Sequence, residues 1–318
     1  MHEIADGHWK GFEGEDIDII IDLVSILEIS YLPAGFLSSN CGLNNNWKMK
    51  EYFKGKVVFI TGSSKGIGKA TAELLGSYGA RICLNGRNIE SLRKTYTELK
   101  AKNIDCMQIA GDVSDSEVCF RMIRKIVEHY DRLDILINNA GISTHGMIRD
   151  LTPEAWEKAI GINTMGSVYT THHALPYLLQ SRGTVIFISS LAGKVGMPGH
   201  STYSVSKMGL TALARAMQIE FSKKELHTGI IYVGFTENEP DKKILYPDGK
   251  YRQILSRSQK TAKREEVALS IARAIYKKKK ALTLTAVGKL QAVCLRLCPF
   301  VVYMILKKAN RDYTKLYD

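Results

Sequence analysis

From Lys56 onward, short runs rich in Val and Ile alternate with longer amphipathic segments, and this alternation restricts the possible folds most strongly. Short runs that are apolar throughout are typical of strands buried on both faces, and helical connections between them make such strands parallel. The sequence therefore predicts an α/β protein with a doubly wound parallel sheet and right-handed crossovers. Six strands are expected at 57–61, 81–85, 105–110, 133–138, 184–189 and 229–233. The helices are expected at 66–78, 89–102, 115–130, 202–224 and, as a pair, at 153–180.

The ends of the chain differ from this central pattern. After Gly234 a polar stretch with several turn residues predicts a mobile loop over a site, followed by a helix at 264–280 and a closing strand at 281–285. We expect one main domain at 49–285, an N-terminal extension of unknown role at 1–48 and a C-terminal segment at 286–318. Because Met49 lies a few residues ahead of the first strand run and resembles a natural start, the extension is interpreted as an appendage or an over-extended reading frame.

The formal net charge of +12 is unevenly distributed. Residues 1–48 hold two basic and eight acidic side chains, whereas residues 277–318 hold ten basic and two acidic ones. A basic tail beside apolar residues fits an anionic lipid surface at least as well as a nucleic acid, so no nucleic-acid partner is expected. The six cysteines form no CxxC pair, which predicts reduced thiols and no metal site. The N-terminus lacks a signal-peptide pattern, so a cytoplasmic protein is expected.

The C-terminal segment is apolar over 286–306 apart from a few polar positions. Its uninterrupted part is about ten residues, which is shorter than the roughly 20 that a membrane span needs. Lys289, Arg296 and Tyr303 are spaced seven apart, which predicts one amphipathic helix with these side chains on a common face. Such a helix suits a membrane surface, a partner subunit or the surface of its own domain, and the pattern does not choose among them.

The first strand run leads into a glycine-rich turn and then a helical pattern. The turn reads Thr61-Gly62-Ser63-Ser64-Lys65-Gly66-Ile67-Gly68. Glycines permit a tight turn and let backbone N–H groups approach a pyrophosphate, while the helix N-terminus favours negative charge. A glycine turn in the order strand, turn, helix predicts a dinucleotide-binding site.

Further motifs make this prediction more specific. Asn138-Asn139-Ala140-Gly141 follows the fourth strand, and Asn163, Ser190 and Tyr203-x-x-x-Lys207 come later in the chain. Together with the Thr-Gly-x-x-x-Gly-Ile-Gly turn, this set resembles the short-chain dehydrogenase/reductase family over about residues 54–236. The resemblance implies a Rossmann fold, hydride transfer with a nicotinamide cofactor, and subunits that associate as a homo-oligomer.

Charge at the end of the second strand predicts the choice of cofactor. NAD needs an acidic acceptor for its ribose there, whereas the extra phosphate of NADP needs cations. The stretch 84–87 holds no carboxylate, and Arg87 with Lys65 is expected to clamp that phosphate, so NADP(H) is predicted. By resemblance, Asp112 and Val113 lie beside the adenine. The predicted cofactor-binding residues are Gly62, Ser63, Ser64, Lys65, Gly66, Ile67, Gly68, Arg87, Asp112, Val113, Asn139, Ala140, Gly141, Tyr203, Lys207 and Thr236.

Tyr203 and Lys207 are four residues apart, so on a helix both side chains project from one face. A nearby ammonium stabilises a phenolate and lowers a tyrosine pKa from about 10, which suits proton transfer at neutral pH. By resemblance, Ser190 polarises the carbonyl, and it is preferred to Ser189 because thirteen residues separate it from Tyr203. Asn163 is expected to kink a helix and hold a water, with a purely structural bond from helix to backbone as the alternative.

The family pattern implies reduction of a carbonyl or oxidation of a secondary alcohol. A tail at a membrane surface would favour a lipophilic substrate such as a long-chain acyl, sphingoid or steroid-like ketone. One departure affects the site, because the Pro-Gly that usually follows the sixth strand is replaced by Val233-Gly234, which leaves the geometry around Thr236 open. The alternative is a non-catalytic nucleotide-binding or membrane-surface protein on the same scaffold, which an intact Ser190, Tyr203 and Lys207 set does not favour.

Overall fold

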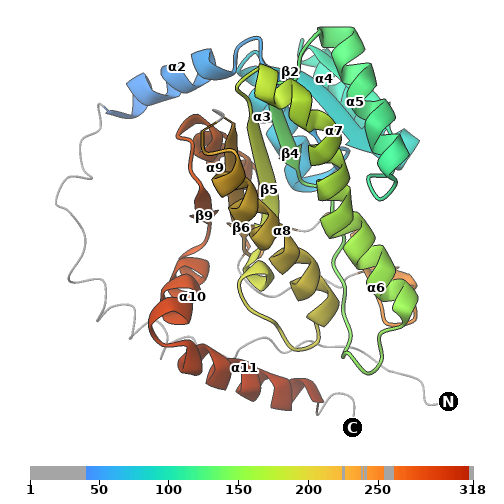
Figure 1. Cartoon of the computed structure of the whole chain (residues 1–318), viewed down its shortest axis with the longest axis vertical. Coiled ribbons are helices and arrows are strands. Elements are labelled where there is room, and N and C mark those ends of the chain that lie inside the picture. The colour runs from blue at the N-terminus through green and yellow to red at the C-terminus, as the bar shows by residue number, and fades with distance from the viewer. Residues whose placement is uncertain (1–40, 224–225, 238, 240–241, 254–260, 315–318) are drawn as a thin grey trace.

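The computed structural model describes residues 41–223, 226–237, 239, 242–253 and 261–314. Predictions for residues 1–40 therefore lie outside the described residues. A seven-stranded parallel sheet has the order β3-β2-β1-β4-β5-β6-β9, which confirms the predicted doubly wound sheet (Figure 1). The strands are β1 (Val57–Ile60), β2 (Arg81–Gly86), β3 (Cys106–Ala110), β4 (Ile135–Asn138), β5 (Thr184–Ser190), β6 (His227–Val233) and β9 (Ala281–Thr283).

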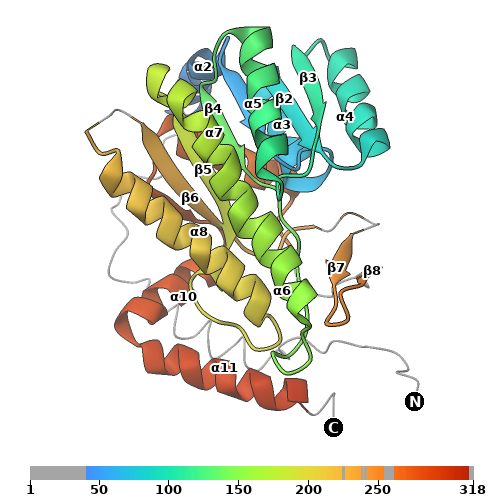
Figure 2. The same cartoon turned by 45° about the vertical axis from the view of Figure 1, so that its right-hand side comes forward.

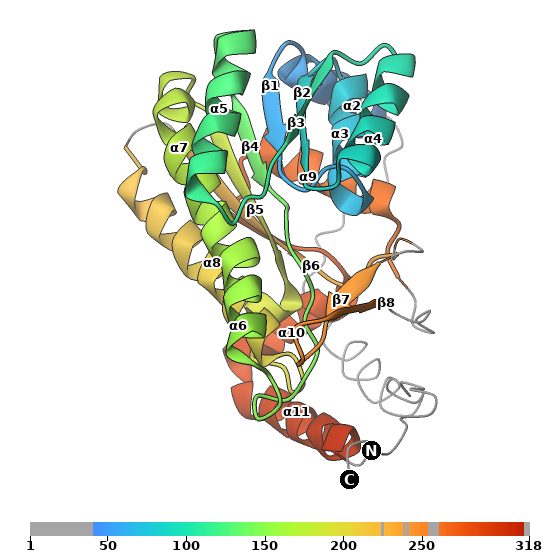
Figure 3. The ribbon, with the colours of Figure 1, turned by 90° about the vertical axis from the view of Figure 1, so that its right-hand side faces the viewer.

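Two helical layers cover the sheet, one on each face (Figure 3). One layer consists of α2 (Cys41–Phe53), α3 (Gly66–Ser77), α4 (Ile89–Ala101) and α9 (Arg264–Tyr276). The other consists of α5 (Ser116–Tyr130), α6 (Pro153–Ile160), α7 (Gly166–Gln180) and α8 (Ser201–Glu220). Along β1, Val58 and Ile60 belong to the first core whereas Val57 and Phe59 belong to the second. A central strand such as β1 thus needs apolar residues at every position, which explains its uninterrupted apolar run, whereas the edge strand β3 has exposed positions.

Local signals set several helix boundaries. The Asp115 side chain accepts hydrogen bonds from the N–H groups of Glu117 and Val118, at 2.8 and 3.0 Å, so α5 begins at residue 116. Helix α9 ends at Tyr276, four residues before the predicted end, because Lys278 adopts a left-handed backbone conformation with φ of 47°. Helix α8 likewise ends at Glu220 rather than at 224.

The stretch between β6 and α9 differs from the predicted loop. It contains a small antiparallel hairpin of β7 (Lys243–Leu245) and β8 (Tyr251–Gln253), seen beside α6 in Figure 2. Leu245 is fully buried, and its backbone bonds to the loop after β4, donating to Ser143 and accepting from His145. Gly249, with φ of 73°, allows the tight turn between the strands. Three-residue strands are too short to leave a recognisable alternation, so the sequence pattern missed the hairpin.

Both terminal regions also require a correction. Helix α2 runs across the expected boundary at 48/49, and its residues Met49 and Phe53 are buried in the main core. The predicted single C-terminal helix is two helices, α10 (Ala286–Leu297) and α11 (Pro299–Thr314). Pro299 causes the break, because a proline disfavours helical geometry at the preceding residue and suits the first position of a new helix. Tyr303 therefore does not share a continuous helix with Lys289 and Arg296. No helix among the described residues has the length and apolarity needed to cross a membrane.

Candidate cofactor and active site

The glycine turn lies between β1 and α3, at the carboxyl end of the sheet. Gly62 has φ of 63°, and a Cβ there would lie 2.8 Å from the Cα of Ala140. At Gly68 a Cβ would lie 2.6 Å from the amide nitrogen of Asn139. Both positions therefore require glycine, and the turn can approach the loop after β4 only because these side chains are missing.

Three polar side chains hold the glycine turn in place. Asn139 Nδ2 donates to the carbonyls of Thr61 and Gly62, at 2.9 and 3.0 Å. Thr61 Oγ1 accepts in return from the backbone N–H groups of Asn139 and Ala140. Asn85 Oδ1, at the end of β2, accepts from Gly62 N at 3.2 Å. Thr61 is the first residue of the predicted turn motif, whereas Asn85 was not predicted, although an amide at the end of a buried strand is a usable signal.

Asn138 and Asn139 have different roles. Asn138 points into the helical layer, where Nδ2 donates to Thr171 Oγ1 at 2.9 Å and Oδ1 accepts from Thr170 Oγ1 at 2.6 Å. It therefore joins β4 to α7, whereas Asn139 braces the glycine turn. Of the two neighbouring amides, only Asn139 contacts the glycine turn in this structure.

A small pocket of about 120 Å³ opens beside this turn. It lies where β1 meets β4 and the connection to the next strand reverses direction, which is the usual ligand position in such sheets. The pocket brings together Gly62, Arg87, Asp112, Val113, Ala140 and Gly141, all predicted cofactor residues, with Asn85, Gly111, Ile142 and Ile162. Lys65 is exposed at the start of α3, and Thr236 is not among the residues that line this pocket.

Arg87 and Asp112 form an ion pair with each other, with Nη1 and Oδ2 3.2 Å apart. Burial alone would raise the pKa of Asp112, but hydrogen bonds from Ser114 and the charge of Arg87 lower it below its ordinary value. Both groups are therefore charged at neutral pH. The sequence predicted a phosphate contact for Arg87 and an adenine contact for Asp112. In the structure the two side chains pair with each other.

The side chains of Tyr203 and Lys207 lie on one face of α8. Lys207 is almost completely buried, and its Nζ donates to the Ile188 carbonyl at 3.0 Å and lies 5.9 Å from the centre of the Tyr203 ring. Burial lowers the pKa of Lys207 to about 8. A Cβ on Gly141 would lie 3.2 Å from this Nζ, so the glycine of the Asn-Asn-Ala-Gly motif leaves the space beside the lysine open.

The structure separates the two candidate serines at the end of β5. Ser189 is buried, and its Oγ donates to the Lys207 carbonyl at 3.1 Å, so this hydroxyl joins β5 to α8. Ser190 is half-buried, and its Oγ accepts from Ala192 N at 3.3 Å. The alternation of a strand places them on opposite faces of the sheet. Only Ser190 keeps a hydroxyl at the accessible end of the strand.

Asn163 lies in a π turn, Gly161–Met165, between α6 and α7. The side chain is fully buried, and Oδ1 accepts from Ile142 N at 2.7 Å. Nδ2 donates to the Ile142 carbonyl at 3.0 Å and to Ser206 Oγ at 2.9 Å. The amide thus fixes the loop after β4 to the helix that carries Tyr203 and Lys207, which matches the structural alternative considered for this residue.

Two histidines and a tyrosine cluster beside the start of α8. The ring centres of His145 and His200 are 5.1 Å apart, and those of His145 and Tyr246 are 5.9 Å apart. His200 Nδ1 lies 2.8 Å from the Thr144 carbonyl. Burial and the neighbouring His200 lower the pKa of His145 to about 4, so this ring is neutral at pH 7. The hairpin therefore places Tyr246 beside His145, next to the start of α8.

Comparison with known proteins identifies the family. The model of the short chain dehydrogenase family matches residues 56–246, which is more than half of the chain. This chain belongs to the short-chain dehydrogenase/reductase family. It is therefore an oxidoreductase of that family, as the motifs predicted.

Related proteins and a solved structure agree with this membership. An uncharacterized oxidoreductase of Thermotoga maritima is 32% identical over 227 residues, covering 69% of this chain and 89% of that protein. Dehydrogenase/reductase SDR family member 7B of Rattus norvegicus is 30% identical over 306 residues, covering 93% and 94%. A family member from Burkholderia phymatum, solved in complex with NAD, has a TM-score of 0.67 at 21% identity and covers 77% of this chain and 95% of its own. This last likeness shows a common fold.

Proposed function

We propose that the chain is an NADP(H)-dependent oxidoreductase that transfers a hydride between nicotinamide and a carbonyl or secondary alcohol. The observation that carries this proposal is the placement of Tyr203 and a buried Lys207 on one face of α8, next to Gly141. Gly141, whose Cβ position would lie 3.2 Å from Lys207 Nζ, also lines the pocket beside the glycine turn, so it connects the lysine with that pocket. A non-catalytic nucleotide-binding protein would not need a buried lysine beside a tyrosine.

The described residues fit a nicotinamide dinucleotide. The lack of side chains at Gly62 and Gly68 lets the turn pack against the loop after β4, and Gly62 and Arg87 both line the pocket beside the turn. When bound, the cofactor supplies the hydride donor or acceptor. NADP rather than NAD is favoured because no carboxylate ends β2, and Arg87 and Lys65 provide positive charge there. A 2′-phosphate would compete with Asp112 for the guanidinium of Arg87.

The chain's own residues divide the chemistry among them. Tyr203 gives its phenolic proton to the carbonyl oxygen in reduction and accepts it in oxidation. With a pKa of about 8, Lys207 is mostly cationic at neutral pH and stabilises the phenolate. Ser190 Oγ donates a hydrogen bond to the oxygen as negative charge develops. Asn163 acts as a positioning residue, because its bonds to Ile142 and Ser206 join the two sides of the site.

We further propose a lipophilic ketone as substrate and a peripheral contact of the C-terminal helices with an anionic membrane. Leu297, Phe300 and Tyr303 are 70, 64 and 67% exposed, although all are large and apolar or aromatic. Residues 286–311 contain five basic and no acidic side chains, a composition that favours anionic lipid over a protein interface, where Lys is depleted. The start of α10 lies against the active site, since a Cβ on Gly288 would be 2.6 Å from Leu191, the neighbour of Ser190. A cytoplasmic location and pairing of subunits stay predictions.

Nucleotide titration tests the proposed function. The purified chain is titrated with NADPH and with NADH while nicotinamide fluorescence is followed, and NADPH is expected to bind about tenfold or more tightly. Arg87→Gln should remove this preference, whereas Arg124→Gln, which breaks a comparable ion pair with Glu128 on α5, should keep it. Tyr203→Phe should bind NADPH but reduce lipophilic ketones about a hundredfold or more slowly. Failure to bind either nucleotide would overturn the assignment. Binding without turnover of any ketone would support the non-catalytic alternative.

A further inference from the structure

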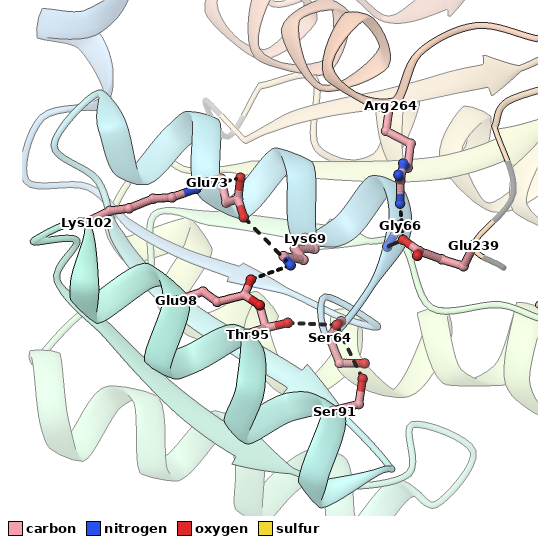
Figure 4. A network of polar contacts seen from close by, with 10 residues as sticks. All are labelled: Ser64, Gly66, Lys69, Glu73, Ser91, Thr95, Glu98, Lys102, Glu239 and Arg264. Carbon is pink, nitrogen blue, oxygen red and sulfur yellow. Dashed lines mark hydrogen bonds and ion pairs between the residues drawn. The ribbon is translucent and has the colours of Figure 1, made fainter. Parts of the chain in front are cut away.

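A carboxylate from a distant part of the chain sits on the glycine turn. Glu239, which follows β6, accepts a hydrogen bond from the backbone N–H of Gly66 at 2.9 Å (Figure 4). The same Oε1 atom is paired with Nη1 of Arg264, the first residue of α9. Both side chains of this pair are partly buried, with exposures of 25 and 29%. The contact bridges 173 positions in sequence, so it is a tertiary feature of the site rather than a local cap.

The position of this contact is unusual because Gly66 begins α3. The N-cap residue Lys65 makes no side-chain capping hydrogen bond, and the first turn of α3 contains no acidic residue. The N–H of Gly66 therefore belongs to a helix N-terminus that has kept its affinity for an anion. A backbone N–H at such a terminus together with a guanidinium is a donor set suited to phosphate oxygens.

Arg264 is only partly satisfied by Glu239. Its Nε is buried and has no hydrogen-bond partner among the described residues. A carboxylate that meets only Nη1 leaves this donor unused, whereas a group with more oxygen atoms can reach both. The arginine is thus able to bind a larger anion than the one it holds.

Other ion pairs near the turn do not share these properties. Lys69 pairs with Glu98, and Glu73 pairs with Lys102 at 3.2 Å, which joins α3 to α4 (Figure 4). These pairs connect side chains only and leave the backbone N–H groups of the turn untouched. The Glu98 pair is therefore a suitable control for a general loss of charge.

We infer that Arg264 is a further cofactor-binding residue, which binds the diphosphate, and that Glu239 takes the place of that diphosphate in the ligand-free protein. The inference rests on the proposed function, since it assumes that a dinucleotide uses the glycine turn. Two anions cannot share the Gly66 N–H, so the cofactor displaces Glu239. Arg264, which is partly buried, then loses its carboxylate partner, and the diphosphate replaces that partner.

This exchange predicts opposite effects for the two side chains. Glu239→Gln removes the competing charge, so the dissociation constant for NADPH should fall about threefold to tenfold. Arg264→Gln removes a charged ligand of the diphosphate, so the same constant should rise about tenfold. The Arg264 effect should persist in the double variant. If Arg264 served only to hold Glu239, its effect would vanish once Glu239 is changed.

The test is a fluorescence titration of the full chain with NADPH for the wild type, Glu239→Gln, Arg264→Gln, the double variant and the control Glu98→Gln. Adenosine 2′-monophosphate, which lacks a diphosphate, is titrated by displacement, and its affinity should not change in any variant. Thermal unfolding without ligand checks that each variant is folded. The inference is overturned if NADPH affinity is unchanged in both single variants, or if it changes equally for NADPH and adenosine 2′-monophosphate. In either case, binding of NADPH by the wild type leaves the proposed function standing. No binding by the wild type overturns the proposed function itself.

Discussion

The segments before and after Val233 are fixed to the rest of the fold by two different kinds of contact. Before this point, the side-chain amides of Asn85, Asn139 and Asn163 each bond to backbone atoms of other elements. After it, the β7–β8 hairpin is attached to the loop after β4 through backbone contacts such as Thr144 with Leu245, although Glu239 binds the glycine turn through its side chain. The groups expected to do chemistry thus lie on elements that are joined through specific side chains, whereas the hairpin beside them is held mainly by backbone bonds that do not depend on side-chain identity. Three experiments test this difference.

The largest effect is expected for Asn163→Ala. The change leaves the N–H and carbonyl of Ile142 and the hydroxyl of Ser206 without their buried partner, so the free energy of unfolding should fall by about 3 to 5 kcal/mol. Chemical denaturation measures this loss, and ketone reduction should fall with it. Gln108→Ala removes an amide from an exposed position on β3 and should change stability by less than about 0.5 kcal/mol. Similar losses in both variants would contradict the proposed bracing role.

Lys207→Met is expected to abolish activity yet stabilise the fold. Burial lowers the pKa of Lys207 from its ordinary 10.5 to about 8, so the folded state disfavours the charged form by about 3 kcal/mol at pH 7. Losing the bond to the Ile188 carbonyl costs about 1 kcal/mol, which leaves a net gain of about 2 kcal/mol.

The pH dependence gives a second measurement on this lysine. Between about pH 8 and 10.5 the unfolded state binds more protons at this group than the folded state does, so the contribution of Lys207 to stability rises with pH. Denaturation at pH 7 and pH 9.5 should show this rise in the wild type and in the exposed-residue control Lys125→Met, but less of it in Lys207→Met. A loss of stability at pH 7 in Lys207→Met would argue against a buried cation.

The smallest change in stability is expected on α11. The double change Phe300→Ser and Tyr303→Ser alters exposed side chains, so unfolding should shift by less than about 0.5 kcal/mol. Co-sedimentation with phosphatidylcholine vesicles that contain phosphatidylserine should nevertheless fall several-fold. Ile219→Ser, at a position 76% exposed on α8, is the matched control and should bind as the wild type does. If the wild-type chain does not co-sediment with anionic vesicles, the proposed membrane contact is wrong.

The sequence predicts the elements before Val233 better than those after it. The glycine turn, the strands up to Val233 and the choice of Ser190 over Ser189 all rest on patterns that are local or regularly spaced. The hairpin leaves no such pattern, since each strand has three residues. The break between α10 and α11 did have a signal, the proline at position 299. The seven-residue spacing of Lys289, Arg296 and Tyr303 favoured a single helix instead. The contact of Glu239 with Gly66 depends on how α9 packs beside α3, and residues so far apart in sequence leave no pattern that predicts it.

The π turn at Gly161–Met165 has a consequence for how this chain can evolve. Such a turn holds one residue more than the α-helical path, and each residue turns a helix by about 100°. Removing one residue there would rotate α7 relative to α6 and take Ala174 and Leu178, both fully buried, away from the sheet. Substitutions in this segment alter single contacts, but a one-residue deletion would misplace a whole helical face. We therefore expect natural variants of this chain to conserve the length of the segment more strictly than its residues.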